Sequence, residues 1–332
     1  MLRLRHKKRF DLLAMKKLST LFLLVIFAFA STARAQELIA EIPFQYAYNG
    51  WITVTATVND EGPYDFIVDT GATISVVFEN LNQQQNFEYV EGEMRRILGL
   101  IEANDLPPRF IGDIEVGGLT LGDLTSVVIS DWTAPQETPQ GVLGLDFFGQ
   151  YAVQIDPVAQ VIRLYSGGAP DEITSQRKWS GARIDPRYFG DSPRPLYVVK
   201  SEVRGRKYPF ILDLGASGTV INYEAVRDML STRRVTVRST RPTRIPEVQD
   251  LFGNKARSRL VRIQQMKIGR AKWRDKIVSV YDSDVFNELG VGEQPYGLFG
   301  VDMVNDRQVI VDFPNNRIHF GPVIKRRDTA TN

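Results

Sequence analysis

The stretch Phe66-Ile67-Val68-Asp69-Thr70-Gly71-Ala72-Thr73 recurs 144 positions later as Phe210-Ile211-Leu212-Asp213-Leu214-Gly215-Ala216-Ser217. In both copies three apolar residues, typical of a short buried strand, lead into an aspartate that is followed two positions later by glycine. A glycine there lets two backbones approach closely or supplies an unusual dihedral angle. The repeated stretch therefore predicts a strand that delivers one carboxylate to a tight turn, twice.

The rest of the chain repeats in the same order. Val116-Gly117 returns at an offset of 152 as Ile268-Gly269, and Gly141–Asp146 returns at an offset of 156 as Gly297–Asp302. The offset only grows along the chain, as loop insertions in a duplicated domain would produce. We therefore predict a signal peptide over 1–35, an N-terminal lobe over 36–165, a linker over 166–193, a C-terminal lobe over 194–322 and a polar tail over 323–332.

Short apolar or alternating runs, broken by Gly, Asn, Asp and Pro, dominate the chain and indicate β-strands. A modest helix is possible at Tyr223–Leu230. We expect an all-β fold of two related, closed β-rich lobes with pseudo-two-fold symmetry, in which equivalent loops meet at the axis and a cleft lies between the lobes.

The composition excludes most mechanisms of enzymatic hydrolysis. The 332 residues include no cysteine and two histidines, and His6 lies in the segment predicted to be cleaved off. A Ser-His-Asp triad would rest on His319 alone, and neither thiolate nor His-rich zinc sites can be built. His319 alternates with Ile318 and Phe320 and is expected to be a surface or satisfied histidine. We predict no metal and no cofactor, which leaves carboxylates, Lys, Tyr or hydroxyls.

The N-terminus has the pattern of an export signal. Basic residues over 1–17 precede an uncharged stretch from Leu18 to Ala33, which closes on Ala33-Arg34-Ala35. The run is shorter than the roughly 20 apolar residues that span a bilayer, although an uncleaved anchor is the alternative. We expect cleavage near Ala35 and a periplasmic or secreted protein.

Charge is unevenly distributed. The formal net charge of +2 becomes −5 once residues 1–35, with eight basic residues and one acid, are removed. Residues 233–276 hold fourteen Lys or Arg against three acids. This stretch is expected to be a solvated face, with contact to an anionic envelope surface as the alternative. Export argues against a nucleic-acid partner.

Asp69 and Asp213, brought together at the axis, would form a close carboxylate pair. Two such charges cannot both ionise, so one proton is shared and the two titrations separate. The ionised member can then accept a proton from water while the protonated member donates to a carbonyl oxygen. This pair could hydrolyse amides without histidine, cysteine or metal.

These motifs resemble those of aspartic proteases, in the retropepsin-like version found in two-lobed bacterial chains. The resemblance rests on Asp69-Thr70-Gly71-Ala72, on Val142-Leu143-Gly144 and Leu298-Phe299-Gly300, and on Val311–Ile318, which resembles the closing hairpin of pepsin-like C-terminal lobes. It implies Asp69 and Asp213 as catalytic residues, a cleft between the lobes and a peptide or unfolded-protein substrate. The residues implied to support the site are Thr70, Gly71, Ala72, Leu214, Gly215 and Ala216, with Leu143, Gly144, Phe299 and Gly300 in the apolar-Gly elements.

Two departures from the family pattern bear on activity. The family places Thr or Ser after each aspartate, where the hydroxyl bonds to the opposite loop; Thr70 fits and Leu214 does not. Ala72 and Ala216 stand where pepsin-like relatives often place a hydroxyl that favours the charged carboxylate. We therefore expect a pair that titrates higher than in gastric enzymes, with activity at mildly acidic to neutral pH.

Flaps are expected between each aspartate and the following Gly-rich element. The candidates are Arg96–Asn104, with Gly99 at the tip between Leu98 and Leu100, and Val248–Arg259, around Phe252, Gly253 and Asn254. Plain surface loops are the alternative. Apolar residues there (Leu98, Leu100, Leu251 and Phe252) would suit contact with an extended peptide. The recurrent Asp146, Asp302, Asp156 and Asp312 are expected to be structural.

The sequence thus predicts an exported aspartic endopeptidase. A catalytically inactive peptide- or polymer-binding protein that keeps the fold is the first alternative, with Leu214 in its favour. An envelope structural or adhesion protein that uses the basic stretch 233–276 is the second.

Overall fold

A computed structural model describes residues 36–47, 50–131, 139–190, 192–231 and 246–324. The predicted signal peptide and part of the basic stretch lie outside these ranges. Within them the chain is mostly β, as expected, and none of its helices has the length and apolar character needed to cross a membrane.

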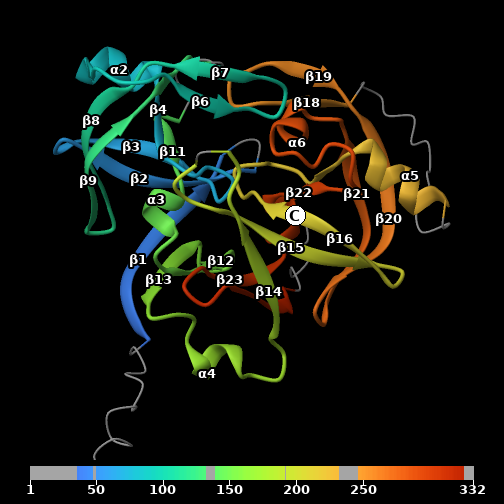
Figure 1. The fold of residues 1–332 in the computed structure, drawn as a ribbon. Helices are drawn as coiled ribbons and strands as arrows, with labels where there is room; N and C mark the ends of the chain where they lie inside the picture. Colours follow the sequence, from blue (N-terminus) through green and yellow to red (C-terminus); the bar gives the residue numbers. More distant parts are fainter. Residues whose placement is uncertain (1–35, 48–49, 132–138, 191, 232–245, 325–332) are drawn as a thin grey trace, which may run out of the picture. The chain divides into compact units, whose positions relative to one another are not determined.

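The elements follow the predicted duplication (Figure 1). The N-terminal half holds β1 (Glu37–Tyr46), β2 (Ile52–Val58), β3 (Glu61–Val68), β4 (Val76–Phe78), α2 (Glu79–Gln85), β5 (Glu88–Tyr89), β6 (Arg95–Leu98), β7 (Ala103–Leu106), β8 (Arg109–Val116), β9 (Leu119–Ser126), β10 (Val128–Ile129), β11 (Gly141–Leu143), α3 (Leu145–Phe148), β12 (Ala152–Asp156) and β13 (Val161–Ser166). The C-terminal half holds β15 (Leu196–Val203), β16 (Arg206–Leu212), β17 (Val220–Ile221), α5 (Tyr223–Ser231), β18 (Glu247–Gln249), β19 (Lys255–Arg257), β20 (Arg259–Ile268), β21 (Ala271–Val280), α6 (Asp284–Glu288), β22 (Gly297–Phe299), the 3-10 turn η1 (Val301–Met303), β23 (Arg307–Asp312) and β24 (Arg317–Val323).

One antiparallel sheet joins the two halves. Its order is β1-β13-β12-β23-β24-β14, where β14 is Ser180–Arg187, and its central pair is β12 with β23. Gln154 pairs with Ile310, its own counterpart at the offset of 156, while Val153 pairs with Val311 and Ile155 with Val309. This self-complementary register places the pseudo-two-fold axis through the middle of the sheet.

The two halves use the same strand pairing around each aspartate. β3 runs parallel to β11 with Phe66 opposite Gly141, and β16 runs parallel to β22 with Phe210 opposite Gly297. A Cβ atom on Gly141 would lie 2.4 Å from the Phe66 ring, and one on Gly297 would lie 2.6 Å from the Phe210 ring. Each glycine therefore makes room for the aromatic ring beside it.

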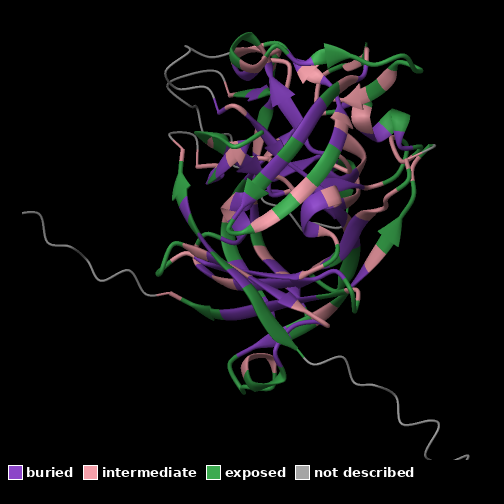
Figure 2. Cartoon of the chain, turned by 90° about the vertical axis from the view of Figure 1, so that its left-hand side faces the viewer, coloured by how far each residue is buried: buried purple, intermediate pink, exposed green. Residues whose placement is uncertain are grey.

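The core is continuous through both halves, and two smaller apolar clusters flank the aspartate-bearing strands. The N-lobe cluster consists of Ile67, Val76, Phe78, Val127, Ile129 and Val142. The C-lobe cluster consists of Val198, Ile211, Val220, Val248, Phe286, Leu289, Tyr296 and Leu298. Figure 2 shows the buried residues concentrated on the inner strands, with exposed ones on the rims and turns.

Three local expectations can be compared with the structure. The predicted helix is present as α5, one residue longer than expected. The segment 166–193 is more than a linker, because it contains α4 (Asp171–Thr174) and β14 (Ser180–Arg187), which pairs with both β15 and β24. His319 lies on β24 and is buried, at 8% exposure, where burial lowers its pKa, so of the two predicted alternatives the surface position does not hold.

Candidate active site

Each aspartate sits where a buried strand ends and is held by the neighbouring apolar-Gly strand. The amide of Asp69 donates to the carbonyl of Leu143 at 3.0 Å, and the amide of Asp213 donates to the carbonyl of Phe299 at 3.1 Å. The two loops are therefore built alike, as the repeat predicted.

The structure brings the two carboxyl groups together. Oδ1 of Asp69 accepts hydrogen bonds from the amide of Gly71, at 2.6 Å, and from the amide of Gly215 in the other half, at 3.2 Å. Oδ1 of Asp213 accepts from the amide of Ala216 at 2.9 Å, and the two side chains are hydrogen-bonded to each other. One site is thus made of residues 144 positions apart.

Glycine is required on both sides of this pair. A Cβ atom on Gly215 would lie 2.2 Å from Cγ of Asp69, and one on Gly71 would lie 2.8 Å from Cγ of Asp213. Each loop presses its glycine backbone against the carboxyl group of the opposite loop, so any side chain would displace the pair.

The electrostatic environment gives the two carboxyl groups different pKa values. Both keep part of their surface open to solvent, yet the protein around them removes enough water to raise the pKa of each. The negative charge of Asp69 raises the pKa of Asp213 further, well above the ordinary value, whereas backbone amides partly offset the effect at Asp69. Two backbone amides donate to Oδ1 of Asp69 and one to Oδ1 of Asp213, which favours the charged form at Asp69 and leaves the shared proton on Asp213.

A single hydroxyl cross-links the two loops. Oγ1 of Thr70 donates to the carbonyl of Leu212 at 3.0 Å and accepts from the amide of Leu214 at 3.1 Å. The Leu214 side chain has no polar atom and lies in the main core, at 2% exposure. Thr70 thus makes the predicted hydrogen bonds to the second half. Leu214 has no hydroxyl and cannot make the equivalent hydrogen bonds to the first half.

The two apolar-Gly elements support the loops from behind. The amide of Leu145 donates to the carbonyl of Ala72 at 2.8 Å, and that of Val301 donates to the carbonyl of Ala216 at 2.9 Å. A Cβ atom on Gly144 would lie 2.7 Å from the Ala72 oxygen, so the two backbones are in direct contact. Gly300 meets the Ala216 and Gly218 backbone in the same way.

Sequence reasoning missed two supporting residues, Ser75 and Thr219. Oγ of Ser75 donates to Asp146 at 2.6 Å and accepts from the amide of Gly144 at 3.0 Å. Oγ1 of Thr219 donates to Asp302 at 2.8 Å and accepts from the amide of Gly300 at 3.2 Å. Both residues share the offset of 144 that relates the aspartates, which was the available signal.

The recurrent acidic residues outside the pair take structural positions, as expected. Asp146 and Asp302 accept the bonds just described. Asp156 accepts from the amides of Val158 and Ala159 in its own turn, at 3.0 and 3.2 Å. Asp312 accepts from the amide of Asn315 at 3.2 Å and from that of Ala169 at 2.9 Å. These carboxylates cap turns rather than face the pair.

The predicted flap segments form two β-hairpins. The first hairpin is β6–β7, and the Gly99 amide closes its turn by donating to the carbonyl of Glu102 at 2.8 Å. The second hairpin is β18–β19, and Asp250 holds its turn by accepting from the amides of Phe252 and Asn254 at 3.0 and 2.8 Å. The predicted second range was slightly too long, because Arg259 already belongs to β20.

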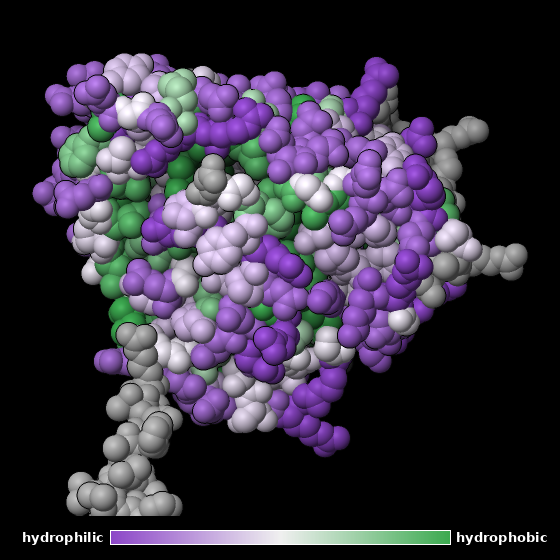
Figure 3. Space-filling model, in the orientation of Figure 1, coloured by the Kyte–Doolittle hydropathy of each residue, from purple (hydrophilic) through white to green (hydrophobic). Residues whose placement is uncertain are grey.

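The two hairpin tips cross to opposite halves (upper part of Figure 1). Leu98 and Leu100 of the first hairpin pack against the C-lobe cluster, whereas Leu251 and Phe252 of the second pack against the N-lobe cluster. The tips also meet each other, since a Cβ atom on Gly99 would lie 2.9 Å from the Phe252 ring. Figure 3 shows a largely hydrophilic face with apolar residues visible in its recesses.

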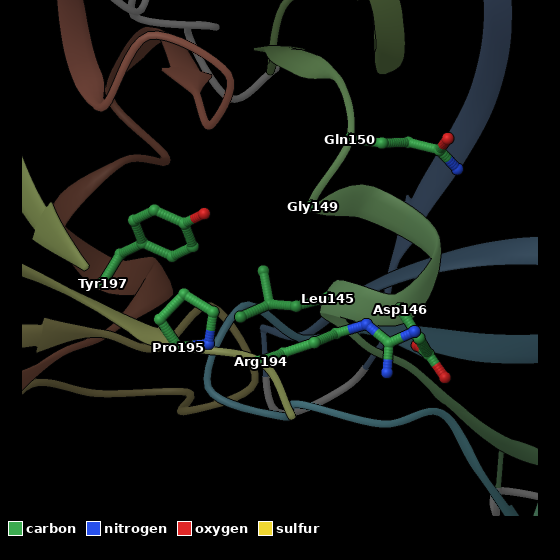
Figure 4. A pocket seen from close by; sticks show the side chains of 7 residues that line it. All are labelled: Leu145, Asp146, Gly149, Gln150, Arg194, Pro195 and Tyr197. Atoms are coloured by element: carbon green, nitrogen blue, oxygen red, sulfur yellow. The ribbon is translucent and has the colours of Figure 1, made fainter. Parts of the chain in front are cut away.

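A pocket of about 340 Å³ lies between α3 of the N-terminal half and the start of β15 of the C-terminal half. Its lining residues are Leu145, Asp146, Gly149, Gln150, Arg194, Pro195 and Tyr197 (Figure 4). Neither aspartate of the pair lines it. Across the described ranges, no group of three or more His, Asp or Glu side chains is arranged to hold a metal ion.

Comparison with known proteins identifies the family. The family described as aspartyl protease matches residues 54–147 and 199–303, one stretch in each half and together more than half of the chain. The chain therefore belongs to the aspartyl protease family. Among solved structures it is similar to the aspartic proteinase from Irpex lacteus, with 13% identity and a TM-score of 0.49 over 90% of this chain and 100% of that one. No curated protein matches its sequence.

Proposed function

We propose that the protein is an aspartic endopeptidase of the retropepsin-like type, acting through Asp69 and Asp213 on peptides or unfolded protein. The observation that carries this proposal is the hydrogen-bonded carboxyl pair, in which the pKa of Asp213 is raised well above that of an ordinary aspartate. Such a pair holds one proton between two oxygens and so supplies a base and an acid at the same place.

The proposed reaction uses both members at once. The carboxylate of Asp69 takes a proton from a water molecule as the water oxygen attacks the carbonyl carbon of the scissile amide. Asp213 gives its proton to the carbonyl oxygen, which produces a neutral tetrahedral intermediate. Transfer of the proton now on Asp69 to the departing nitrogen breaks the carbon–nitrogen bond, and the carbonyl re-forms as its hydroxyl proton returns to Asp213.

The test is digestion of a peptide library by the purified protein and by its Asp69→Asn variant. We expect cleavage by the wild type and none by Asp69→Asn, which should still fold and unfold cooperatively on heating. Asp65→Asn, an exposed aspartate on the same strand, is the matched control and should retain cleavage. Cleavage by Asp69→Asn would remove Asp69 from the mechanism.

Leu214 favours a second candidate, a peptide-binding protein that has lost turnover. Its buried aliphatic side chain has no hydroxyl, so only one of the two loops supplies a side-chain cross-link, through Thr70. A statine-type inhibitor distinguishes the two functions when it is titrated alongside the peptide digest. Stoichiometric binding without any cleavage would support the inactive protein.

We further propose export, on the strength of the basic and apolar pattern over 1–35. N-terminal sequencing of the exported protein should begin at or near Gln36, and a start at Met1 would contradict this. For the basic stretch 233–276 we propose contact with an anionic surface, supported by exposed Arg259, Lys272 and Arg274 on β20 and β21. Binding to anionic vesicles should weaken as salt is added.

A further inference from the structure

Helix α6 of the C-terminal half holds the first hairpin at two points. Oγ of Ser283, the residue before the helix, donates to the carbonyl of Leu100 at the hairpin tip. Glu288, at the end of the helix, forms an ion pair with Arg96, whose guanidinium lies 2.8 Å from Oε1. This hydrogen bond and this ion pair hold the hairpin at the two ends of one short helix, and we call them the clasp.

Ser283 is built into the fold at this point. Its side chain is buried, at 1% exposure, and its Oγ also accepts from the amide of Val285 at 3.1 Å, which caps the helix. Leu100 and Val285 both pack on the C-lobe cluster. The hairpin therefore docks on a preformed helix end with both polar and apolar contacts.

Arg96 has two acidic partners, one in its own hairpin and one in the other half of the molecule. Asp105 lies in the same hairpin, at 3.2 Å, while Glu288 lies in the other half of the molecule. The exposed fractions are similar, with 49% for Arg96, 53% for Asp105 and 40% for Glu288. The chain thus contains a matched pair of interactions, one that links the halves and one that does not.

The docked tips occupy the apolar surface that a substrate would need. Ile211 and Leu298 of the C-lobe cluster lie beside the Asp213 loop, and they are in the cluster that receives Leu98 and Leu100. Leu251 and Phe252 pack against the N-lobe cluster, which includes Ile67 on the strand that leads to Asp69. An extended peptide bound across the pair must share or displace these contacts.

We propose that Ser283 and Glu288 are positioning residues that hold the first hairpin closed, so that the clasp competes with substrate for the apolar surface beside the aspartate pair. The inference rests on the proposed peptidase function. Opening the clasp exposes the C-lobe cluster without altering the carboxyl groups, so substrate affinity changes while the chemical step does not.

The kinetic test compares Glu288→Gln with Asp105→Asn. Each change removes one acidic partner of Arg96, but only Glu288→Gln removes an ion pair between the halves. From the usual strength of exposed ion pairs we expect Glu288→Gln to lower KM about two- to fivefold, with kcat and the pH profile unchanged, and Asp105→Asn not to lower KM. A KM that Glu288→Gln leaves unchanged or raises would overturn the proposal.

A second measurement is independent of turnover. The chain has no cysteine, so Glu102→Cys at the hairpin turn and Asp284→Cys on α6 can be spin-labelled as the sole pair. We expect a short, narrow distance distribution that shifts to longer distances with Glu288→Gln, with added Ser283→Ala and with high salt. A distribution unchanged by all three would overturn the clasp even if peptides are cleaved. The shift without any peptide cleavage would leave the clasp standing and refute the peptidase.

Discussion

The amide of Gly215 lies 3.2 Å from Oδ1 of Asp69, so the loop of one half completes the carboxylate site of the other. The same glycine lies so close to Asp69 that no side chain fits between them. The geometry of the carboxyl pair therefore depends on this backbone contact between the halves.

Gly215→Ala should disable the site. Its Cβ would lie 2.2 Å from Cγ of Asp69 and would push the carboxyl groups apart. Displacements of about 1 Å at a reacting group cost on the order of 100-fold in rate, so we expect at least that loss in kcat/KM. Gly218→Ala is the control in the same loop, because nothing lies within 4 Å of its Cβ position; an equal loss in both variants would contradict this explanation.

Thr70→Val should weaken the fold and the site together. The change leaves the carbonyl of Leu212 and the amide of Leu214 without their partner. Buried groups left unsatisfied in this way cost about 1–3 kcal/mol, which urea unfolding would measure. Thr120→Val, at an exposed position, should stay near the wild-type value, and a Thr70→Val protein of unchanged stability would show that the cross-link contributes little.

Asp213→Asn should stabilise the protein at neutral pH. The folded state raises the pKa of Asp213 well above 3.8, so its stabilising contribution is complete below the unfolded pKa and is lost as pH rises through the folded pKa. Each unit of that upward shift costs about 1.4 kcal/mol at higher pH, and asparagine avoids this cost. The gain in unfolding free energy should be small at pH 3 and larger at pH 7; a gain independent of pH would contradict the assignment of the retained proton.

The pH dependence of cleavage follows from the same two groups. The proposed mechanism requires Asp69 ionised and Asp213 protonated, and the pKa of both is raised. We therefore expect a bell-shaped kcat/KM profile with its maximum at mildly acidic to neutral pH. A sharp optimum near pH 2 with no activity at pH 6 would refute this expectation.

The sequence was sufficient to predict what the duplication repeats. The paired strands, the meeting of Asp69 with Asp213 and the supporting glycines follow from motifs that recur in order. Ser75 and Thr219 could have been found by the same offset, although a lone hydroxyl carries little signal without its acidic partner.

What the sequence did not predict depends on contacts between distant segments. Strand β14 has Ile184 as its one large buried apolar residue and contains Pro186, so its sequence lacks the alternation of apolar and polar residues that indicates a strand. It forms because β15 and β24 provide strand edges for it to pair with. The local sequence does not predict that each hairpin tip packs on the opposite half, because Leu98 and Phe252 show only that the turns are apolar. Leu98 and Phe252 each pack on a cluster whose members lie 100 or more residues away in the sequence.

The register of β12 with β23 has one more implication. Gln154 lies opposite its own counterpart, so strand β12 pairs antiparallel with the equivalent strand of the second half, β23. A fragment that ends after β13 would present this strand as an open edge, and two such fragments would be able to close upon each other. The present chain bears the geometry of a symmetric dimer whose subunits have been fused.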